Sequence, residues 1–262
     1  MSPTDDDPSI GDAAESDTAI TVLLDATLDA DDPTSIRLLT DGDIEVHGRM
    51  PWSSNGTFLV SVSDATNRVQ AIYKPESGER PLWDFPAGLW RRELATYLLA
   101  RSLEWPVVPP TVERDGPMGI GSLQFFVSAH FEQHYFTVSE RDEHRHALQQ
   151  ICVLDVLSNN TDRKGGHVLV GRDDRLWAID HGLNFHAEFK LRTVMWDFAG
   201  EPIPTDIVES VGAFLDAGVP DDLVDLLAPD EVGALVQRAR GVVSSGRFPT
   251  DPTGRRYPWP LV

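Results

Sequence analysis

The stretch NTDRKGGHVLVGRDDRLWAIDHG, residues 160–182, alternates polar loops with short apolar runs and carries an aspartate in a loop near each end. Asp162 lies in the turn-rich loop NTDRKGGH, which leads into the strand-like run HVLV. Asp180 follows a second strand-like run, RLWAI, where the chain enters another loop. The stretch therefore predicts two short strands, with one carboxylate before the first and another after the second.

The chain before this stretch predicts the helix that leads into it. HRHALQQICVLDVLSNN, residues 144–160, has the length and apolar content of a largely buried helix. Asn159 and Asn160 suit its carboxyl end, because asparagine tolerates the left-handed conformation in which many helices stop. Asp155 within this helix is expected to be a buried structural acceptor, and a catalytic role for it stays open.

Farther upstream the sequence consists of short β-type runs interrupted by one amphipathic helix. The helix is predicted over about 87–103, where apolar residues recur at helical spacing between Gly88 and the prolines that begin at Pro106. The expected strands are 43–50, 57–62, 69–74, 111–114 and 122–131.

The carboxyl-terminal third completes the fold class. From residue 204 the sequence predicts helices, with breaks at 218–220 and 229. We expect an α+β fold with two lobes, a small β-rich N-lobe of about 44–130 and a helical C-lobe of about 131–262.

The charged residues follow these elements in the order that phosphoryl transfer from ATP requires. Lys74 ends a predicted strand and is suited to neutralise phosphate oxygens, with Glu93 of the next helix holding it in place. Asp162 is placed to accept or orient the proton of an attacking hydroxyl, and Asp180 to bind a Mg²⁺ that bridges the phosphates. SSNGTF at 53–58 offers small residues that let backbone amides approach a phosphate.

Several segments resemble a known kinase family. They are SSNGTFLV, AIYKP, RRELATYLLA, GSLQFFV, LDVLSNNTDRKGGHVLV and AIDHGLNF. These segments, within 50–185, are similar to the type II phosphatidylinositol 4-kinases and, more loosely, to the atypical kinases that include HipA-like and Fam20-like kinases. NTDR at 160–163 and IDHGLNF at 179–185 are the strongest matches. The whole chain also resembles an actinobacterial family described as phosphatidylinositol 3- and 4-kinase-like.

The resemblance implies an atypical protein-kinase-like fold and a set of site residues. Residues 124–127 would line the adenine pocket through their backbone. Apart from the resemblance, Arg163 and Lys164, in the short loop between Asp162 and His167, are expected to grip a γ-phosphate or an acidic substrate. The implied ATP-binding residues are Ser54, Asn55, Gly56, Thr57, Lys74, Glu93, Gln124, Phe126 and Val127. The expected catalytic residues are Asp162, which the resemblance implies, with Arg163 and Lys164; the expected metal ligands are Asp180, which the resemblance implies, and His167.

One position departs from the family pattern. Five residues after the catalytic aspartate these kinases usually have an asparagine that binds the metal, and this chain has His167. Imidazole is a softer ligand than an amide oxygen and suits Mn²⁺ better than Mg²⁺. The expected cofactors are therefore ATP with Mg²⁺ or Mn²⁺, and His167 predicts a preference for Mn²⁺ or one weak metal site.

The expected activity is transfer of the γ-phosphoryl group of ATP to a hydroxyl of an unidentified metabolite, protein or lipid head group. Two alternatives stay open: a pseudokinase, which His167 favours, and a nucleotidyl transferase on the same fold. The residues also have purely structural interpretations. Lys74 would be a strand-edge charge, Glu93 a partner of Arg91 or Arg92, and both aspartates turn residues.

The composition limits the partners. Forty-two acidic residues against twenty-two basic ones give a net charge of −20, which disfavours nucleic acids and anionic membrane surfaces. Residues 1–32 hold ten acids and no lysine or arginine and are expected to form an acidic, disordered tail, although 19–28 suits a short helix or strand. The lone Cys152 and the lack of a membrane-length apolar run predict a cytoplasmic protein with no stable membrane insertion.

Overall fold

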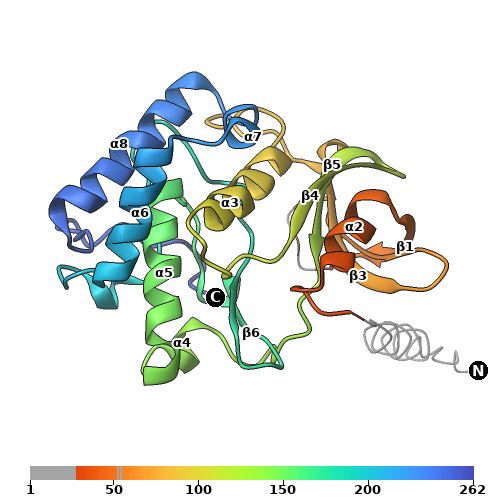
Figure 1. Ribbon diagram of the computed structural model, residues 1–262, viewed down its shortest axis with the longest axis horizontal. Coiled ribbons are helices and arrows are strands. Elements are labelled where there is room, and N and C mark those ends of the chain that lie inside the picture. Colours follow the sequence, from red (N-terminus) through yellow and green to blue (C-terminus); the bar gives the residue numbers. More distant parts are fainter. Residues whose placement is uncertain (1–27, 52, 54) are drawn as a thin grey trace, which may run out of the picture.

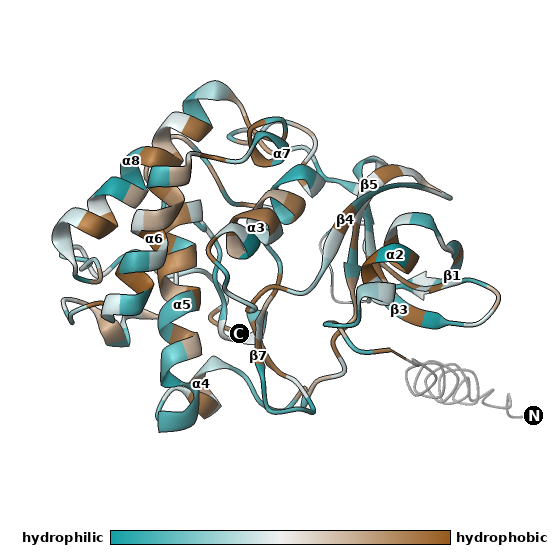
Figure 2. Ribbon diagram, viewed as in Figure 1, coloured by the Kyte–Doolittle hydropathy of each residue, from teal (hydrophilic) through white to brown (hydrophobic). Residues whose placement is uncertain are grey.

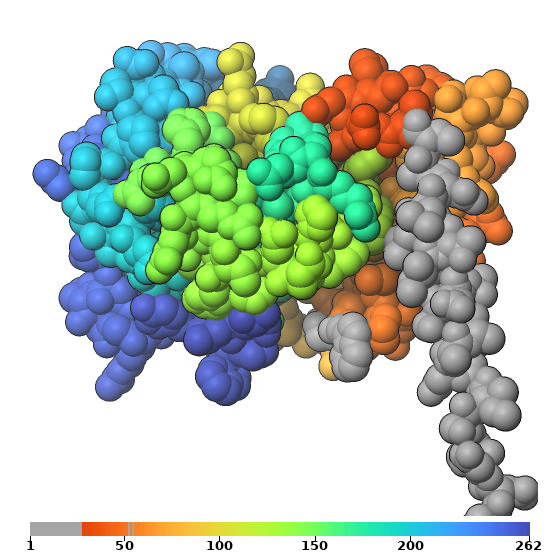
Figure 3. Space-filling model, turned by 90° about the horizontal axis from the view of Figure 1, so that it is seen from below, coloured from red at the N-terminus to blue at the C-terminus, as the bar shows by residue number. Residues whose placement is uncertain are grey.

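The computed structural model describes residues 28–51, 53 and 55–262, and within them the chain forms two lobes (Figure 1). The small lobe consists of helix α2 and strands β1 to β5, and the large lobe of helices α4 to α8 with strands β6 and β7. Figure 3 shows α2 and β1 to β3 of the small lobe in red and orange, beside the large lobe in green to blue. Most of the expected acidic tail, nearly all of 19–28, and Ser54 lie outside the described residues.

The small lobe is built on an antiparallel sheet in the order β1-β2-β3-β5-β4. Its strands are β1 (Asp43–Arg49), β2 (Phe58–Ser63), β3 (Arg68–Pro75), β4 (Thr111–Gly116) and β5 (Gly119–Phe125). All five predicted strands are confirmed. Strand β5 begins and ends earlier than predicted, because Gly116 pairs with Gly119 and only two residues are left for the hairpin turn.

Helix α2 (Pro33–Asp41) covers the outer face of this sheet and is absent from the sequence prediction. Asp32 caps it by accepting a hydrogen bond from the Thr34 backbone N–H at 2.8 Å, and Pro33 occupies its first turn. Its buried leucines, in the brown stretch of α2 in Figure 2, pack on the apolar side chains of the sheet. These residues are Leu38, Leu39, Val60, Val62, Val69, Ala71 and Tyr73.

The other face of the sheet presents the site residues to the large lobe. Because side chains alternate along a strand, Ile72 and Lys74 of β3 point away from the core that holds Ala71 and Tyr73. Helix α3 (Trp90–Ser102) lies between the two lobes (Figure 1). It starts three residues later than the predicted 87–103 but ends within one residue of that prediction.

The large lobe is helical, as predicted. Its helices are α4 (Tyr135–Val138), α5 (Asp142–Ser158), α6 (Thr205–Ala217), α7 (Asp221–Val224) and α8 (Pro229–Ser245). Helix α5 is buried from Ile151 to its end, and it carries Cys152, whose thiol pKa is raised by burial. The core of this lobe also contains residues of α3, including Ala95, Leu99 and Ala100.

The stretch 160–182 forms the predicted loop, strand pair and second loop. Strands β6 (Val168–Val170) and β7 (Leu176–Ala178) pair antiparallel. Asn159 ends α5 with φ of 54°, which confirms the predicted left-handed cap. Its side-chain amide donates to the carbonyls of His186 and Glu188, each at 2.7 Å, and so also holds the loop that follows Asp180.

Among the described residues, no helix combines the length and apolar character that crossing a membrane requires.

Candidate active site

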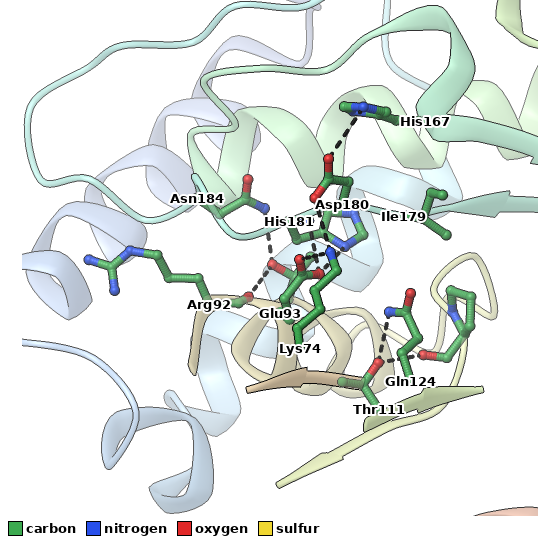
Figure 4. A network of polar contacts seen from close by, with 12 residues as sticks. Lys74, Arg92, Glu93, Thr111, Gln124, His167, Ile179, Asp180, His181 and Asn184 are labelled. Atoms are coloured by element: carbon green, nitrogen blue, oxygen red, sulfur yellow. Dashed lines mark hydrogen bonds and ion pairs between the residues drawn. The ribbon is translucent and has the colours of Figure 1, made fainter. Parts of the chain in front are cut away.

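Lys74, Glu93 and Asp180 meet between the lobes (Figure 4). Lys74 stands near the end of β3, Glu93 in the first turn of α3, and Asp180 two residues after β7. The Lys74 ammonium forms an ion pair with Glu93 Oε1 and another with Asp180 Oδ1 at 3.0 Å. One cation therefore links a strand of the small lobe to the helix between the lobes and to a loop of the large lobe.

The charges in this group reinforce one another. Burial by itself would lower the pKa of Lys74, but the Asp180 and Glu93 carboxylates outweigh it and raise that pKa above its ordinary value. The Lys74 ammonium in turn holds the pKa of Asp180 well below the usual range for a carboxyl group. Lysine and aspartate are thus both charged at neutral pH, as phosphate and metal binding require. Asp180 also has φ of 62°, a strained conformation for a residue with a side chain, of the kind found at functional sites.

Glu93 is held from two sides. While Oε1 contacts Lys74, Oε2 accepts a hydrogen bond from the His181 backbone N–H at 2.9 Å. The His181 ring is fully buried, and neither of its nitrogens has a hydrogen-bond partner among the described residues. Burial lowers the pKa of His181 well below its ordinary value, so the ring packs against Glu93 as a neutral group.

Asp162 faces the same cavity from the loop before β6. Its carboxylate lies 2.9 Å from the Lys164 ammonium, and its backbone N–H donates to Asn160 Oδ1 at 2.9 Å. Asn160 in turn donates to Asp155 Oδ1 at 3.0 Å, which anchors the loop to α5. Burial raises the pKa of Asp162, with Lys164 opposing that rise. A carboxylate of raised basicity is suited to take a proton from a hydroxyl.

Arg163 does not contact the cavity, contrary to the expectation that it grips a phosphate. Its side chain is 0% exposed, and its Nε and one terminal nitrogen bond the Asp155 carboxylate at 2.9–3.1 Å. The other terminal nitrogen donates to the Ile179 and His167 carbonyls, at 2.8 and 3.2 Å. Arg163 therefore ties α5 to the loops that carry Asp162 and Asp180. The same contacts confirm that Asp155 is a buried acceptor.

His167 stands beside Asp180, with its Nε2 3.4 Å from Asp180 Oδ2. Burial lowers the pKa of His167 to about 4, so its imidazole is neutral at physiological pH and keeps a lone pair for a metal. Asp180 remains ionised. The donor set of one carboxylate and one neutral imidazole facing one cavity fits a divalent cation.

The remaining ligands of such a cation would come from elsewhere. Within the part of the chain that the structure describes, no group of three or more His, Cys, Asp or Glu side chains is arranged to hold a metal. Mg²⁺ commonly takes one or two protein ligands and completes its shell with substrate phosphates and water. A metal at Asp180 and His167 is thus expected to bind together with the nucleotide.

The turn between β1 and β2 is docked on a second turn. The Gly56 N–H donates to the Gly78 carbonyl at 2.7 Å, and a Cβ on Gly56 would lie 2.8 Å from the Gly78 Cα, so neither glycine tolerates a side chain without movement. Asn55 Oδ1 accepts from the Arg80 backbone N–H at 3.1 Å. Because the Gly56 amide already has a partner, it is not free to bind a phosphate as expected.

These residues surround a cavity of about 470 Å³. Ten of its lining residues were predicted from the sequence or adjoin a predicted residue, and they come from both lobes. They are Ser53, Asn55, Gly56, Thr57, Lys74, Glu93, Asp162, Lys164, His167 and Asp180. Sequence reasoning missed further lining residues, namely Pro75, Glu79, Arg80, Leu82, Leu89, Trp90, Gly182 and Leu183. One sequence signal could have indicated the turn that contacts Gly56. It is Gly78, in the segment ESGER directly after the strand of Lys74.

Gln124, Phe126 and Val127 do not line this cavity, although all three are described. Gln124 is buried and donates to Thr111 Oγ1 at 2.9 Å (Figure 4). Phe126 and Val127 instead border a separate cavity of about 610 Å³, which also touches Trp177. The expected adenine-binding residues therefore do not line the cavity that contains Lys74 and Asp180.

The sequence and the fold both have known relatives. No protein-family model matches the sequence. Phosphatidylinositol 4-kinase gamma 3 of Arabidopsis thaliana is 35% identical over 102 residues, which cover 35% of this chain and 17% of that protein. The structure of hydra Fam20 with sugar has a TM-score of 0.55 at 12% identity and covers 82% of this chain and 90% of its own.

A second solved structure, that of the Helicobacter pylori proinflammatory kinase CtkA, has a TM-score of 0.51 at 11% identity and covers 80% of this chain and 94% of its own. These two likenesses confirm the expected two-lobed, atypical kinase-like fold. Protein Rv2133c of Mycobacterium tuberculosis is 40% identical over 260 residues, which cover 85% of this chain and 94% of that protein. The chain has a kinase-like fold and belongs to the family of Rv2133c.

Proposed function

We propose that the protein is a phosphotransferase that moves the γ-phosphoryl group of ATP to a hydroxyl group. The observation that carries the proposal is the position of Lys74 between Glu93 and Asp180 at the wall of a cavity that Asp162 also lines. Phosphoryl transfer needs little covalent chemistry from the protein, since positioning and charge stabilisation lower most of the barrier. This arrangement offers both.

Each residue has a role in the proposed reaction. Lys74 binds phosphate oxygens and keeps its charge because two carboxylates stabilise it. Asp162, whose pKa is raised by burial, accepts the proton of the attacking hydroxyl. Lys164 orients Asp162 through its ion pair of 2.9 Å and adds a positive charge to the cavity. Asp180 and His167 would hold Mg²⁺ or Mn²⁺, whose charge offsets that of the phosphates.

The walls of the cavity also suit the nucleotide that would carry the phosphates. Thr57, Leu82, Leu89 and Leu183 give the cavity polar and apolar walls that suit a nucleotide.

We propose residues 33–262 as one catalytic unit whose lobes join near residue 130. We keep the cytoplasm as its location, in line with a single, buried cysteine. The acceptor stays a metabolite, a protein or a lipid head group.

A pseudokinase is the second candidate. His167 favours it, because this residue replaces the asparagine that the resembling kinases use for a metal. In the proposed enzyme the imidazole is a metal ligand, whereas in a pseudokinase its contact with Asp180 would merely fill the site.

The deciding experiment follows label from ATP into fractions of a cell extract with Mg²⁺ and with Mn²⁺. We expect label from the γ-phosphate to enter the lipid, protein or small-molecule fraction with the wild-type protein and not with Asp162→Asn. Label from the α-phosphate in place of the γ-phosphate would indicate nucleotidyl transfer. Bound ATP with no label in any fraction would indicate the pseudokinase.

A further inference from the structure

Helix α3 supplies Glu93 and packs against both lobes, since it contacts β4 and β5 of the small lobe and α7 of the large lobe. Its buried residues Ala95, Leu99 and Ala100 belong to the same hydrophobic core as residues of α5, α6 and α8. The core of the small lobe is a separate cluster made by α2 and the sheet. In Figure 1, α3 accordingly lies between the sheet and the helices of the large lobe. Lys74 thus stands in the sheet of the small lobe, whereas Glu93 stands on a helix that bridges the two lobes.

A buried ion pair fixes α3 on the large lobe. Arg92 precedes Glu93, and its side chain points away from Glu93 in Figure 4. Its guanidinium contacts Glu231 Oε1 in the first turn of α8, and the two side chains are 3% and 11% exposed. Glu231 Oε2 accepts from the Ala228 backbone N–H at 2.9 Å, so the carboxylate is itself held in place. Burial lowers the pKa of Arg92, and Glu231 counters that effect.

A second polar link acts one turn farther along α3. Asn184 donates to Thr96 Oγ1 and to Ser158 Oγ, each at 3.0 Å, and so joins α3 to the end of α5. Asn184 belongs to the loop that follows Asp180. The helix is therefore tied to the large lobe both at α8 and at the loop of the candidate metal ligand.

We propose that Arg92 and Glu231 are positioning residues, which hold α3 on the large lobe so that Glu93 meets Lys74 without help from a partner protein or a modification. The inference rests on the proposed function, because the Lys74–Glu93 contact matters for phosphoryl transfer. The orientation of α3 can nevertheless be measured without any catalytic activity. Neither residue lines the cavity. Each would act on the site only through the orientation of α3.

Zero-length cross-linking with a water-soluble carbodiimide measures that orientation directly. The reagent joins an amine to a carboxylate that it contacts, and Lys74 contacts both Glu93 and Asp180. Peptide mass spectrometry gives the ratio of the Lys74–Glu93 product to the Lys74–Asp180 product. Because the chain has only three lysines, Lys74, Lys164 and Lys190, the products are simple to assign. The ratio needs no activity and no known acceptor.

The variants are Glu231→Gln, which keeps the size of the side chain, and Arg92→Met, with Arg92→Lys as the conservative replacement. Arg91→Met is the matched control, because Arg91 is the exposed neighbour on the same helix. Its guanidinium carbon lies over the Trp90 ring, 4.9 Å from the ring centroid. We expect the ratio to fall about tenfold in Glu231→Gln and Arg92→Met, a coupling of the size seen between linked positions. Arg92→Lys and Arg91→Met should keep it near the wild-type value.

A purely structural role would lower the thermal midpoint in these variants and leave the ratio within twofold of the wild type, and that result would overturn the inference. Should Arg92→Met fail to fold, Glu231→Gln decides the matter alone, since it keeps the Ala228 contact possible. The wild-type protein could also prove unable to transfer phosphate while the product ratio still falls in the variants. That result would support the positioning role and count against the proposed function. Failure of the two proposals is thereby distinguished.

Discussion

Lys74 Nζ lies 3.0 Å from Asp180 Oδ1, although 106 positions separate the two residues in the chain. The contact joins the small lobe to the large lobe across the cavity. Lys74 also pairs with Glu93, whose side chain is 3% exposed, so the removal of Lys74 would leave a buried carboxylate without its cation. The candidate site is therefore most sensitive to substitution of Lys74.

Lys74→Met is expected to lower phosphotransfer by about 10²–10³-fold, the effect of removing one preorganised charge from a site where negative charge develops. ATP affinity should fall as well, because the substitution removes the ammonium that would bind phosphate and that Asp180 and Glu93 keep charged. Lys190→Met is the matched control, since Lys190 is similarly exposed and pairs with Asp84 outside the cavity. Isothermal titration with ATP and a γ-label assay check both quantities. Equal effects of the two substitutions would contradict the assigned role.

Asp162→Asn is expected to lower phosphotransfer by about 10²–10⁴-fold, the usual contribution of a general base, with little change in ATP affinity. The amide keeps the shape of the carboxylate but cannot take up a proton. Single-turnover kinetics separate the chemical step from binding. A variant that loses binding and turnover in parallel would show that Asp162 orients the nucleotide and does not act as a base.

Arg163→Met is expected to destabilise the fold by about 3–5 kcal/mol, because it leaves the buried Asp155 carboxylate without its cation. The expected loss of stability reflects the buried position of Arg163. Replacement of a residue that binds phosphate would instead lower activity and change stability little. Urea unfolding of Arg163→Met beside Lys164→Met measures the contrast. Lys164 is the neighbouring cation and lines the cavity, so its replacement should change turnover far more than the unfolding midpoint.

The sequence predicted the fold and the central charges because both depend on local pattern. Alternating runs marked the strands of the small lobe, and the order of Lys74, Glu93, Asp162 and Asp180 along the elements was enough to place them in one cavity. Helix α2 escaped prediction because its nine residues, PTSIRLLTD, have just three apolar side chains, and its stability comes from covering the sheet.

The misassigned residues show where local pattern ends. Arg163 adjoins Asp162 in sequence, yet adjacent side chains in a turn point in different directions, and burial against Asp155 is set by the tertiary fold. Glu93 had two arginine neighbours as competing partners. The structure places Arg91 over Trp90 and Arg92 on Glu231, which leaves Glu93 to Lys74. Only the three-dimensional position of α8, distant in sequence, distinguishes these outcomes.

Acid is expected to destabilise the protein through His167 and His181. Each has a folded-state pKa below the ordinary histidine value of 6.5, about 4 for His167, because burial disfavours the charged ring. The unfolded chain therefore binds more protons below pH 6.5, and stability present above that pH is lost as the pH falls toward 4. For His167 the loss is on the order of 3 kcal/mol.

Denaturant unfolding between pH 7.5 and 4.5, in the presence of a chelator, measures this dependence. His181→Phe should give a shallower decline, because the phenyl ring fills the buried space and has no proton to gain. His130→Gln is the control, since His130 is a partly exposed residue outside the cavity. A pH profile of His181→Phe that matches the wild type would show that His181 takes up its proton in the folded state.

His167→Asn is expected to change the metal preference of phosphotransfer from Mn²⁺ toward Mg²⁺. The neutral imidazole lies 3.4 Å from Asp180, and as a nitrogen donor it favours Mn²⁺ over Mg²⁺, whereas the amide oxygen of asparagine suits Mg²⁺. Turnover with each metal, and the binding of Mn²⁺ by electron paramagnetic resonance in the presence of ATP, provide the measurement. Equal turnover with both metals in the wild type, unchanged by the substitution, would mean that His167 fills space beside Asp180 without binding the cation.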